Sequence, residues 1–544
     1  MPTTDVLVIG GGIAGCIAAI EAARQGARTT LACAGPLFGG SSFYPGTWGL
    51  GLIGPEDEAD EDDLIETIET VGCGVAEHDL VTTFVRGIRP AIHWLEEDLG
   101  VQLTRPSSQD SAHQKEFIPC FDHKNRMWRG ITRPAFVDSV GKEIRRLDIN
   151  VLEHAELMSL VSPNDTGEVC GAIVFDGRGH SFVSVRARSV VLACGGTSGL
   201  FERTLTSRDV LSSVHGIAMD AGCALTNIEF MQMMPGLVSP KQGLVFNEKT
   251  FRYARFEDPS GLLPLDATVR AKLMETRSGH GPFTSRLGDE LVDLAIDSTG
   301  RDGIAVQYDF PVGEVPEFVQ TFATWLEEEH GISPCDEMRV AMYAHASNGG
   351  IRIDHHCSTG VSSLYACGEA TGGMHGADRI GGLSSANGLV FGRIAGREAA
   401  RNALEASGET ARSSRRLEVE ERDGSERRDS NAYIQDALRA LRCQATPLTQ
   451  ADATRLTSDL RKFMSTYCMI CRTEEGLEKA LSGILALERE LGYHASRKGC
   501  VIAADDALAR SIRLKAQIRL AKEMVRAMQQ RTESRGSHYR ADAK

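Results

Sequence analysis

The chain has 544 residues and a formal net charge of −15, and at about 150 residues per domain this length allows three or four domains. The acidic charge, which no basic stretch offsets, argues against nucleic acid and against an anionic membrane surface as partners. No run approaches the roughly 18 apolar residues of a membrane span. An apolar strand already begins at Asp5, which leaves no room for a signal peptide, so we expect a cytoplasmic protein.

The N-terminus joins an apolar strand to a glycine-rich turn. Residues 5–9 lead directly into Gly10, Gly12 and Gly15, which form a Gly-x-Gly-x-x-Gly pattern, and a helix of small residues follows. In a dinucleotide site one such glycine makes a tight turn, one lets the backbone approach a pyrophosphate, and one lets the helix pack on the strand. The pyrophosphate then lies at the positive helix N-terminus. The segment therefore predicts a dinucleotide site.

Further elements follow in chain order. We expect a second strand over residues 28–33, a glycine-rich loop that contains Gly40, Ser41 and Ser42, and, after an acidic stretch at 56–63, two helices that reach residue 99. Alternating apolar residues then indicate three strands and a helix, which we place at 169–175, 182–185, 189–192 and 207–222.

Three more glycine-rich segments support the dinucleotide site. They contain Gly195 and Gly196, residues 366–369, and residues 375–382. Because glycines at separate places in the chain would all allow a close approach of the backbone to one ligand, we expect a flavoprotein whose FAD-contacting segments are spread over most of the first 400 residues or so.

The same patterns divide the chain into domains. The fold class is α/β: a discontinuous Rossmann-like FAD-binding domain at 1–235 and 349–405, with an inserted α+β capping domain at 236–348, where the α/β rhythm is lost. Residues 406–431 are almost wholly polar and are interpreted as a linker or a solvated helix. Apolar residues at helical spacing indicate a C-terminal helical domain at 432–544, with a frayed polar end.

Fourteen cysteines are scattered along the chain, which fits a reducing compartment better than a disulfide framework. Cys16, Cys194 and Cys367 lie beside the glycine-rich segments and are expected to be small buried residues. Cys468 and Cys471 form a C-x-x-C. Because a zinc or iron–sulfur site needs about four ligands, we expect two core-facing cysteines there and no metal, with a redox pair as the alternative.

The glycine-rich segments, together with His345 through Ile351 and His375 through Ser384, resemble the family of fumarate reductase and succinate dehydrogenase flavoprotein subunits and L-aspartate oxidase. The resemblance implies that Glu369 binds the ribityl hydroxyls of FAD. It also implies that Ser384 lies beside the isoalloxazine ring, at the start of a helix whose positive end favours reduced flavin.

Two departures bear on the cofactor. The second strand ends in Leu31-Ala32-Cys33-Ala34, without the acid that meets an adenosine ribose, which argues against NAD. The respiratory members of the family bind FAD covalently through a histidine, and the matching loop at 39–46 contains none. We therefore expect noncovalent FAD.

The resemblance implies that Arg379 and His345 hold a substrate carboxylate, a role that suits the bidentate guanidinium fork. Two other family positions differ: Met234 replaces a histidine before Pro235, and Leu265 falls where a proton-donating arginine is expected. A nearby cation could replace that arginine, and the candidates are Arg252, Arg255, Arg270 and Arg286.

We therefore expect an FAD-dependent oxidoreductase that reduces or dehydrogenates a small carboxylate-bearing substrate by hydride transfer at flavin N5, with fumarate and succinate disfavoured. Three alternatives remain open. The chain could be the flavin subunit of an electron-transfer complex of the anaerobic glycerol-3-phosphate dehydrogenase type, with an iron–sulfur partner. It could also be an L-aspartate oxidase, or a nonenzymatic FAD-containing scaffold.

Overall fold

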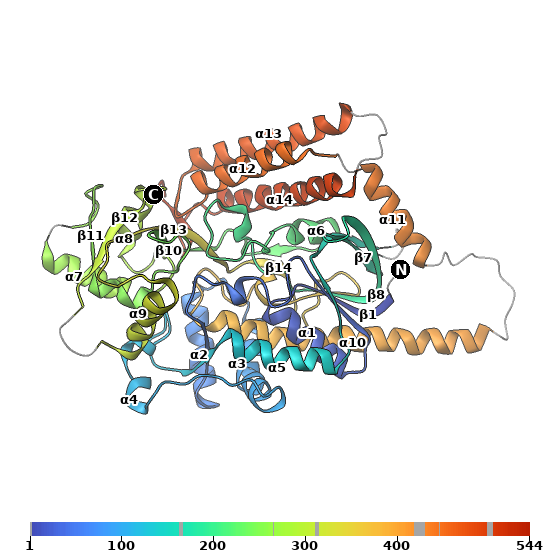
Figure 1. Ribbon diagram of the computed structural model, residues 1–544, viewed down its shortest axis with the longest axis horizontal. Coiled ribbons are helices and arrows are strands. Elements are labelled where there is room, and N and C mark those ends of the chain that lie inside the picture. Colours follow the sequence, from blue (N-terminus) through green and yellow to red (C-terminus); the bar gives the residue numbers. More distant parts are fainter. Residues whose placement is uncertain are drawn as a thin grey trace.

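The computed structural model describes residues 3–162, 167–264, 266–310, 315–417, 430–444, 447–497 and 504–543. Its centre is a mainly parallel sheet in the order β5-β2-β1-β8-β7-β6, with β15 paired to β8 (Figure 1). The strands are β1 (Thr3–Ile9), β2 (Thr29–Cys33), β5 (Asn150–Glu153), β6 (Ala155–Val161), β7 (Gly171–Asp176), β8 (Ser181–Leu192) and β15 (Leu364–Ala366). Only β6, β7 and β8 pair with one another in antiparallel fashion, so the predicted α/β class is confirmed.

Small residues allow two helices to cover this sheet closely. Helix α1 (Ile13–Arg24) follows β1, and α10 (Leu383–Leu417) packs against it. A Cβ atom at Gly392 would lie 2.8 Å from the carbonyl oxygen of Ala14, and one at Gly396 would lie 2.3 Å from that of Ala18. The glycines therefore permit the approach of α10, and the N-terminal end of α10 is brought to the site.

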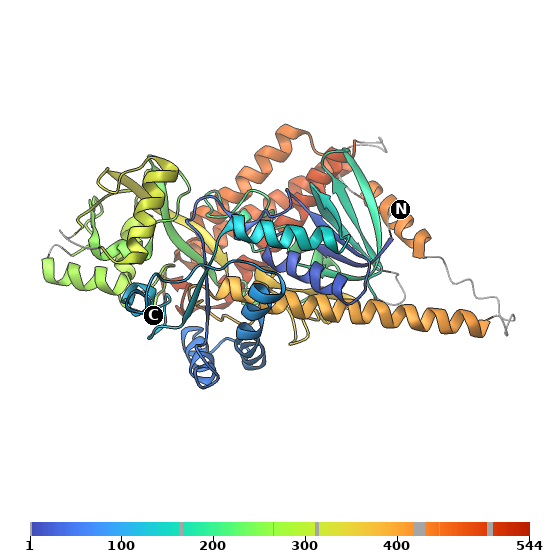
Figure 2. The same ribbon diagram turned by 60° about the horizontal axis from the view of Figure 1, so that its bottom comes forward.

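The inserted segment forms a second, antiparallel sheet in the order β10-β13-β12-β11. Its strands are β10 (Met231–Ser239), β11 (Ala254–Phe256), β12 (Ile304–Tyr308) and β13 (Met338–Ser347), and its helices are α7 (Ala267–Arg277), α8 (Glu290–Ser298) and α9 (Glu317–His330). Figure 2 shows this part to one side of the central sheet. The α+β character was predicted, and the exact bounds of the domain stay a prediction.

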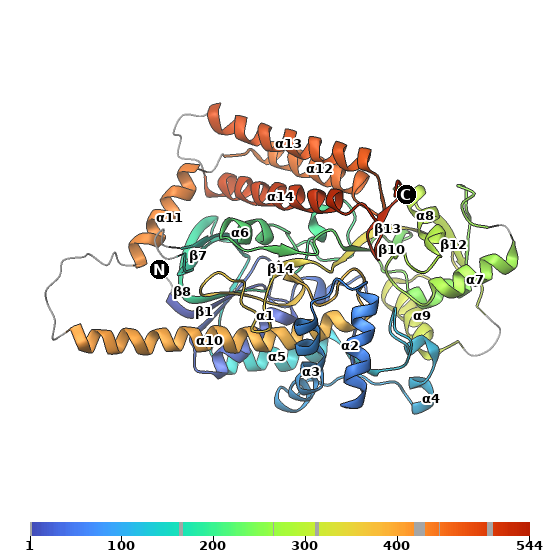
Figure 3. The same ribbon diagram turned by 180° about the vertical axis from the view of Figure 1, so that it is seen from behind.

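The C-terminal part is helical and shares a core with the inserted sheet. Helices α12 (Gln450–Tyr467), α13 (Glu474–Arg497) and α14 (Asp505–Gln530) lie side by side, and α11 (Ser430–Gln444) packs on β7 and β8 (Figure 3). The apolar spacing predicted these helices; α12 buries one stripe of residues, whereas α14 is buried on most of its surface. Among the described residues no helix is long and apolar enough to span a membrane.

Several local bounds differ from the predictions. Helix α10 continues to Leu417, so the start of the 406–431 stretch is helical, which was one of its two interpretations, while residues 418–429 lie outside the described residues. The strands expected at 182–185 and 189–192 form one continuous β8. The helix α6 covers only Val214–Asp220 of the span expected at 207–222. Polar residues inside these elements obscured their bounds, because periodicity locates element types better than ends.

The chain end and the C-x-x-C also differ from expectation. Tyr539–Arg540 forms β18, which pairs with β17 (Cys471–Arg472), and His538 is fully buried, so the tail is packed rather than frayed. Cys468 is buried but Cys471 is exposed, which corrects the expectation that both face the core. In the described part of the chain the cysteines are free, and no cluster of metal-ligating side chains forms.

Two buried histidines make the folded chain sensitive to acid. Burial lowers the pKa of His215 to about 4, and burial together with the Arg472 charge lowers the pKa of His538 to about 2. The unfolded chain binds a proton at each below about pH 6.5, and the folded chain does not. The free energy of unfolding is therefore expected to fall as pH decreases from about 6.5 towards 4, by up to about 1.4 kcal/mol per pH unit for each histidine.

Denaturant titrations at about pH 7, 6 and 5 measure this slope directly. His538→Asn should reduce the slope, whereas His355→Asn, which changes an exposed histidine, should leave it unchanged. A free energy of unfolding that stays constant over this range in the wild-type protein would show that the buried histidines take up protons in the folded chain.

Candidate functional site

Two glycines of the turn after β1 are required for packing of the fold itself. Gly10 has φ +122°, and a Cβ atom there would lie 2.1 Å from the carbonyl oxygen of Ala193. A Cβ atom at Gly15 would lie 1.8 Å from the carbonyl oxygen of Gly10. Both glycines are therefore required by the packing of β1, α1 and the end of β8.

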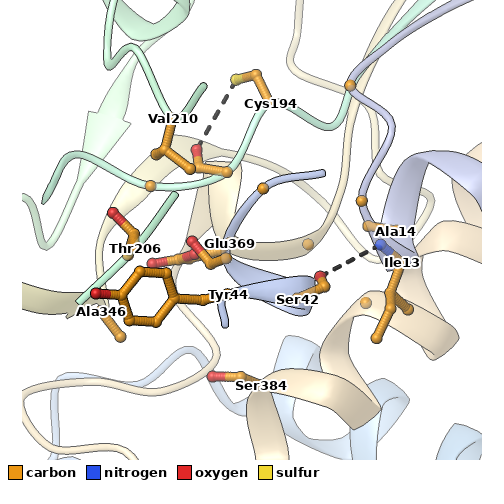
Figure 4. Close-up of a pocket in the computed structure, with 18 of the residues that line it drawn as sticks. Ile13, Ala14, Ser42, Tyr44, Cys194, Thr206, Val210, Ala346, Glu369 and Ser384 are labelled. Atoms are coloured by element: carbon orange, nitrogen blue, oxygen red, sulfur yellow. Dashed lines mark hydrogen bonds between the residues drawn. The ribbon is translucent and has the colours of Figure 1, made fainter. Parts of the chain in front are cut away.

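Gly12 is different because space remains beside it. It is the N-cap of α1 in an extended conformation, and the nearest atom to a Cβ built there is Ser42 Oγ at 3.4 Å. The Ile13 amide donates to the same Ser42 oxygen at 3.3 Å (Figure 4). The N-terminus of α1 thus faces open space, as an anion site requires.

A large cavity begins at this turn and extends towards the inserted sheet. Almost all the site residues that the sequence predicted line this cavity. They are Gly10, Gly12, Gly40, Ser41, Ser42, Gly195, Gly196, His345, Glu369, Arg379 and Ser384. Gly15 does not line the cavity and acts through packing. Segments far apart in the chain therefore meet at one place, as Figure 4 shows for Ser42, Glu369 and Ser384.

Glu369 is held by backbone groups. The Ser347 amide donates to its Oε1 at 3.0 Å, and burial raises the pKa of this carboxyl. A Cβ atom at Gly196 would lie 2.5 Å from the same Oε1, so a side chain there would displace the carboxyl group. The carboxylate is thereby fixed at the cavity wall, where it can accept hydrogen bonds from ligand hydroxyls.

Three further polar residues line the cavity that the sequence patterns did not single out. Asp209 accepts from the Gly40 amide at 2.9 Å and so fixes the loop after β2. Ser213 Oγ and His215 Nδ1 are buried and have no hydrogen-bond partner among the described residues. Buried polar atoms without partners are rare, so these atoms mark places for ligand groups. Ser213 and His215 lie in a serine-rich stretch without a recognisable motif, so the sequence did not predict them.

Helix α10 begins at the cavity. It starts at Leu383, directly before Ser384, and Gly382 precedes it with φ +81°. A Cβ atom at Gly382 would lie 2.2 Å from Ile53 Cγ1. The turn therefore needs glycine both for its positive φ and for the lack of space beside it. The positive end of α10 therefore faces the cavity at Ser384, where it favours negative charge.

Arg379 and His345 lie at the other end of the cavity. Arg379 Nε donates to Gln232 Oε1 at 3.0 Å and its Nη1 donates to the Ile380 carbonyl at 3.2 Å. Within the described part of the chain it has no salt bridge, although it is only 7 % exposed. Burial and the Arg379 charge lower the pKa of His345 to about 3, so this histidine is neutral, and its Nδ1 has no partner among the described residues.

A cysteine and a glutamate complete this end, and sequence reasoning missed both. Cys120 Sγ donates to Glu248 Oε1 at 3.1 Å, and both residues line the cavity with Arg379. Burial and the nearby Glu248 carboxylate raise the pKa of the Cys120 thiol to about 12, so the thiol keeps its proton. Cys120 stands alone between Pro119 and Phe121, and only the three-dimensional arrangement shows its neighbours.

The structure also tests the two departures from the family pattern. Met234 lines the cavity, so an uncharged side chain stands where the family has a histidine. Leu265 lies outside the described residues, and Asp266 caps helix α7. In the described part of the chain none of the four candidate arginines lines the cavity. Their contacts lie elsewhere, with Arg252 bound to Glu116, Arg286 to Asp378, Arg255 to Gln307 and Arg270 to the Pro264 carbonyl.

Comparison with known proteins defines the class. Residues 5–385 match the FAD binding domain family, and residues 457–544 match the family described as fumarate reductase flavoprotein C-term. The chain belongs to this FAD-binding family and is an FAD-dependent oxidoreductase of the fumarate reductase and L-aspartate oxidase type. The resemblance drawn from the sequence is thereby confirmed.

Individual relatives cover nearly the whole chain. A fumarate reductase (CoM/CoB) subunit of Methanothermobacter marburgensis is 27% identical over 99% of this chain and 94% of its own length. L-aspartate oxidase of Yersinia pestis is 27% identical over 99% of this chain and 96% of its own. A variant of Escherichia coli quinol fumarate reductase has a TM-score of 0.77 at 21% identity, covering 100% of this chain and 92% of its own. The last match shows the shared fold.

The cavity fits FAD as the family requires. The open space at Gly12, the unpartnered Ser213 and His215 atoms and the Glu369 carboxylate offer groups for a pyrophosphate, for hydroxyls and for ring edges. The loop that contains Gly40 has no histidine to form a covalent bond, in keeping with noncovalent FAD.

Acid precipitation of the yellow holoprotein is expected to release all of its flavin, at about one FAD per chain, because no side chain in the loop at 39–46 is a histidine that could bond to it. The absorbance of the supernatant measures the released fraction. Yellow colour that stays with the denatured pellet would contradict noncovalent binding.

Proposed function

We propose that this oxidoreductase moves a hydride between flavin and a carbon next to a carboxylate of a small organic acid, and that the acid is neither fumarate nor succinate. Bound FAD supplies the hydride chemistry at its N5 atom. The observation that carries the proposal is Arg379, a buried guanidinium at the cavity without a salt bridge in the described part of the chain. Burial lowers the pKa of this guanidinium despite the nearby Glu369 and Glu248 side chains, so a carboxylate ligand bound directly to it is stabilising.

The binding step uses Arg379 and His345. Gln232 and the Ile380 carbonyl orient the guanidinium, which leaves its remaining N–H groups for a bidentate carboxylate. Neutral His345 can donate or accept one hydrogen bond at Nδ1. Because Met234 carries no hydrogen-bond donor and the four candidate arginines bind elsewhere, a second carboxylate finds fewer partners than fumarate requires.

The proton step is assigned to Cys120 and Glu248. The thiol is protonated, is hydrogen-bonded to the carboxylate and lines the same cavity as Arg379. It can give its proton at Sγ to a substrate carbon, and the Glu248 carboxylate, which accepts the hydrogen bond of the thiol, holds the thiol in position. This pair takes the place of the arginine that the family pattern led us to seek near Leu265.

Cys120→Ala is expected to keep FAD and to lower the rate of substrate-driven flavin oxidation or reduction by about a hundredfold, because general acid catalysis typically contributes 10²–10⁴-fold. Stopped-flow absorbance measures the rate. Cys73→Ala, which changes a partly buried cysteine outside the cavity, is the matched control and should react normally. An unchanged rate in Cys120→Ala would remove the cysteine from the mechanism.

Two related functions stay as candidates because relatives carry them. One relative is named as a subunit of a fumarate reductase, which favours a flavin subunit with an iron–sulfur or other electron-transfer partner. Another is named L-aspartate oxidase, which favours oxidation of an amino acid. Co-purification of an iron–sulfur protein would support the first, and hydrogen peroxide and oxaloacetate formed from aspartate would support the second.

A panel of small acids tests the proposed function. Saturated acids are added anaerobically to oxidised holoprotein and unsaturated acids to reduced holoprotein, and flavin absorbance is followed. We expect at least one acid to change it rapidly, with fumarate and succinate among the slow compounds. Rapid reaction with fumarate or succinate would overturn the assigned role of Met234.

A further inference from the structure

A second cleft lies away from the FAD cavity and shares no lining residue with it among the described residues. Five arginines line it, and we call it the arginine cleft: Arg203, Arg301, Arg461, Arg510 and Arg513. They come from the chain after β8, the turn after α8, helix α12 and helix α14. Its volume is about 580 Å³, which falls within the range of small-molecule sites.

Only part of this positive charge is neutralised. Arg301 pairs with Glu202, and Arg513 forms a bidentate pair with Glu156. Among the described residues Arg203, Arg461 and Arg510 have no salt bridge. Each of the three donates to a backbone carbonyl only, at Gly300, Gly199 and Leu448 respectively. Three full charges thus converge on one cleft of a chain whose net charge is −15.

Burial makes this arrangement costly without a ligand. Arg510 Nε is buried and lacks a partner among the described residues, so this donor is available to a ligand in the cleft. Burial lowers the pKa of Arg461, and the Arg513 charge acts in the same direction. Like charges gathered in one cleft raise the local positive potential and attract an anion.

Helix α12 adds hydroxyl donors on the same face. Thr454, Thr457, Ser458 and Arg461 all line the cleft, and their spacing of three, four and seven residues from Thr454 places them on one side of the helix. The Thr454 hydroxyl already donates to the Gln450 carbonyl at 2.8 Å. The Thr457 and Ser458 hydroxyls remain beside the guanidinium forks, and such groups bind phosphate and carboxylate oxygens. The cleft therefore has donors for several anionic oxygens at once.

We propose that the arginine cleft binds a small multivalent oxyanion, either a phosphate-bearing compound or a polycarboxylate. The unpaired charges of Arg203, Arg461 and Arg510 meet its oxygens, and the α12 hydroxyls complete the contacts. Gln242 and Arg301 belong to the segment that forms the inserted domain, while Arg461 and Arg510 belong to the C-terminal helices. A ligand therefore joins the two parts and stabilises the folded chain.

Isothermal titration of the FAD-loaded full chain with pyrophosphate, and separately with citrate, tests this proposal at about 0.15 M salt. We expect saturable binding of at least one probe and a higher Tm in its presence. Affinity should fall at least about tenfold in Arg461→Gln and in Arg510→Gln. Arg526→Gln, on α14 but outside the cleft, is the matched control and should bind normally.

The two probes distinguish the sources of the anion. Binding of pyrophosphate alone assigns a phosphate-bearing ligand, and binding of citrate alone assigns a polycarboxylate. Affinity that persists in Arg379→Lys excludes the substrate site as the place of binding. The proposal is overturned when neither probe binds saturably, or when the cleft variants bind as tightly as the wild-type protein.

Discussion

Gly12→Val is expected to abolish FAD retention while the apoprotein stays folded. The position has no positive φ, and the nearest protein atom to a new Cβ is Ser42 Oγ at 3.4 Å, so the chain itself tolerates a side chain there. The side chain would instead occupy the space at the N-terminus of α1 that a pyrophosphate needs. Flavin content per chain after purification, together with circular dichroism, measures both outcomes.

Two further variants sharpen this test. Gly15→Val should destroy the fold itself, because a Cβ there would lie 1.8 Å from the Gly10 carbonyl oxygen. Gly492→Ala, where no atom lies within 4 Å of the new Cβ, should keep both fold and flavin. A Gly12→Val protein with a full complement of FAD would refute the assigned pyrophosphate position.

Arg379→Lys is expected to keep FAD and to lose most of the reaction with substrate. Lysine retains the charge but lacks the planar fork, and it cannot make both contacts with Gln232 and the Ile380 carbonyl while binding a carboxylate. We expect the rate of substrate-driven flavin change to fall at least about tenfold, equal to roughly 1.4 kcal/mol of transition-state stabilisation. Flavin content is measured first and the rate second.

Arg286→Lys provides the matched control. Arg286 pairs with Asp378, directly beside Arg379 in sequence, but does not line the cavity. Its conservative replacement should leave the rate unchanged. A normal rate in Arg379→Lys would show that this arginine has a structural role and is not the main partner of the substrate carboxylate.

The sequence predicted which segments line the large cavity. Gly10 lies where the end of β1 closely approaches the end of β8, whereas Gly12 and Gly40 leave open space beside the backbone, and both kinds of position favour glycine in the sequence. Glu369 and Ser384 were singled out because the segments that contain them resemble the FAD-binding segments of the family. The structure brings all of them to one cavity.

The proton-carrying pair could not be predicted because its two members belong to segments without periodicity. Cys120 lies in an irregular stretch after Phe117, and Glu248 is the first residue of a short 3-10 helix, Glu248–Tyr253. Their hydrogen bond spans 128 residues of chain. The same holds for the arginine cleft, where Arg203 and Arg461 meet only through the packing of α12. Long-range packing of this kind has no signature in local sequence.

The most direct test of the central claim compares each reactive acid with its neutral methyl ester. Anaerobic stopped-flow absorbance gives the rate of flavin change for both. If Arg379 and His345 bind a carboxylate, the acid reacts at least about a hundredfold faster than the ester, because the ester leaves the buried guanidinium unpaired. Equal rates for acid and ester, or a panel in which no acid changes the flavin, would contradict the account.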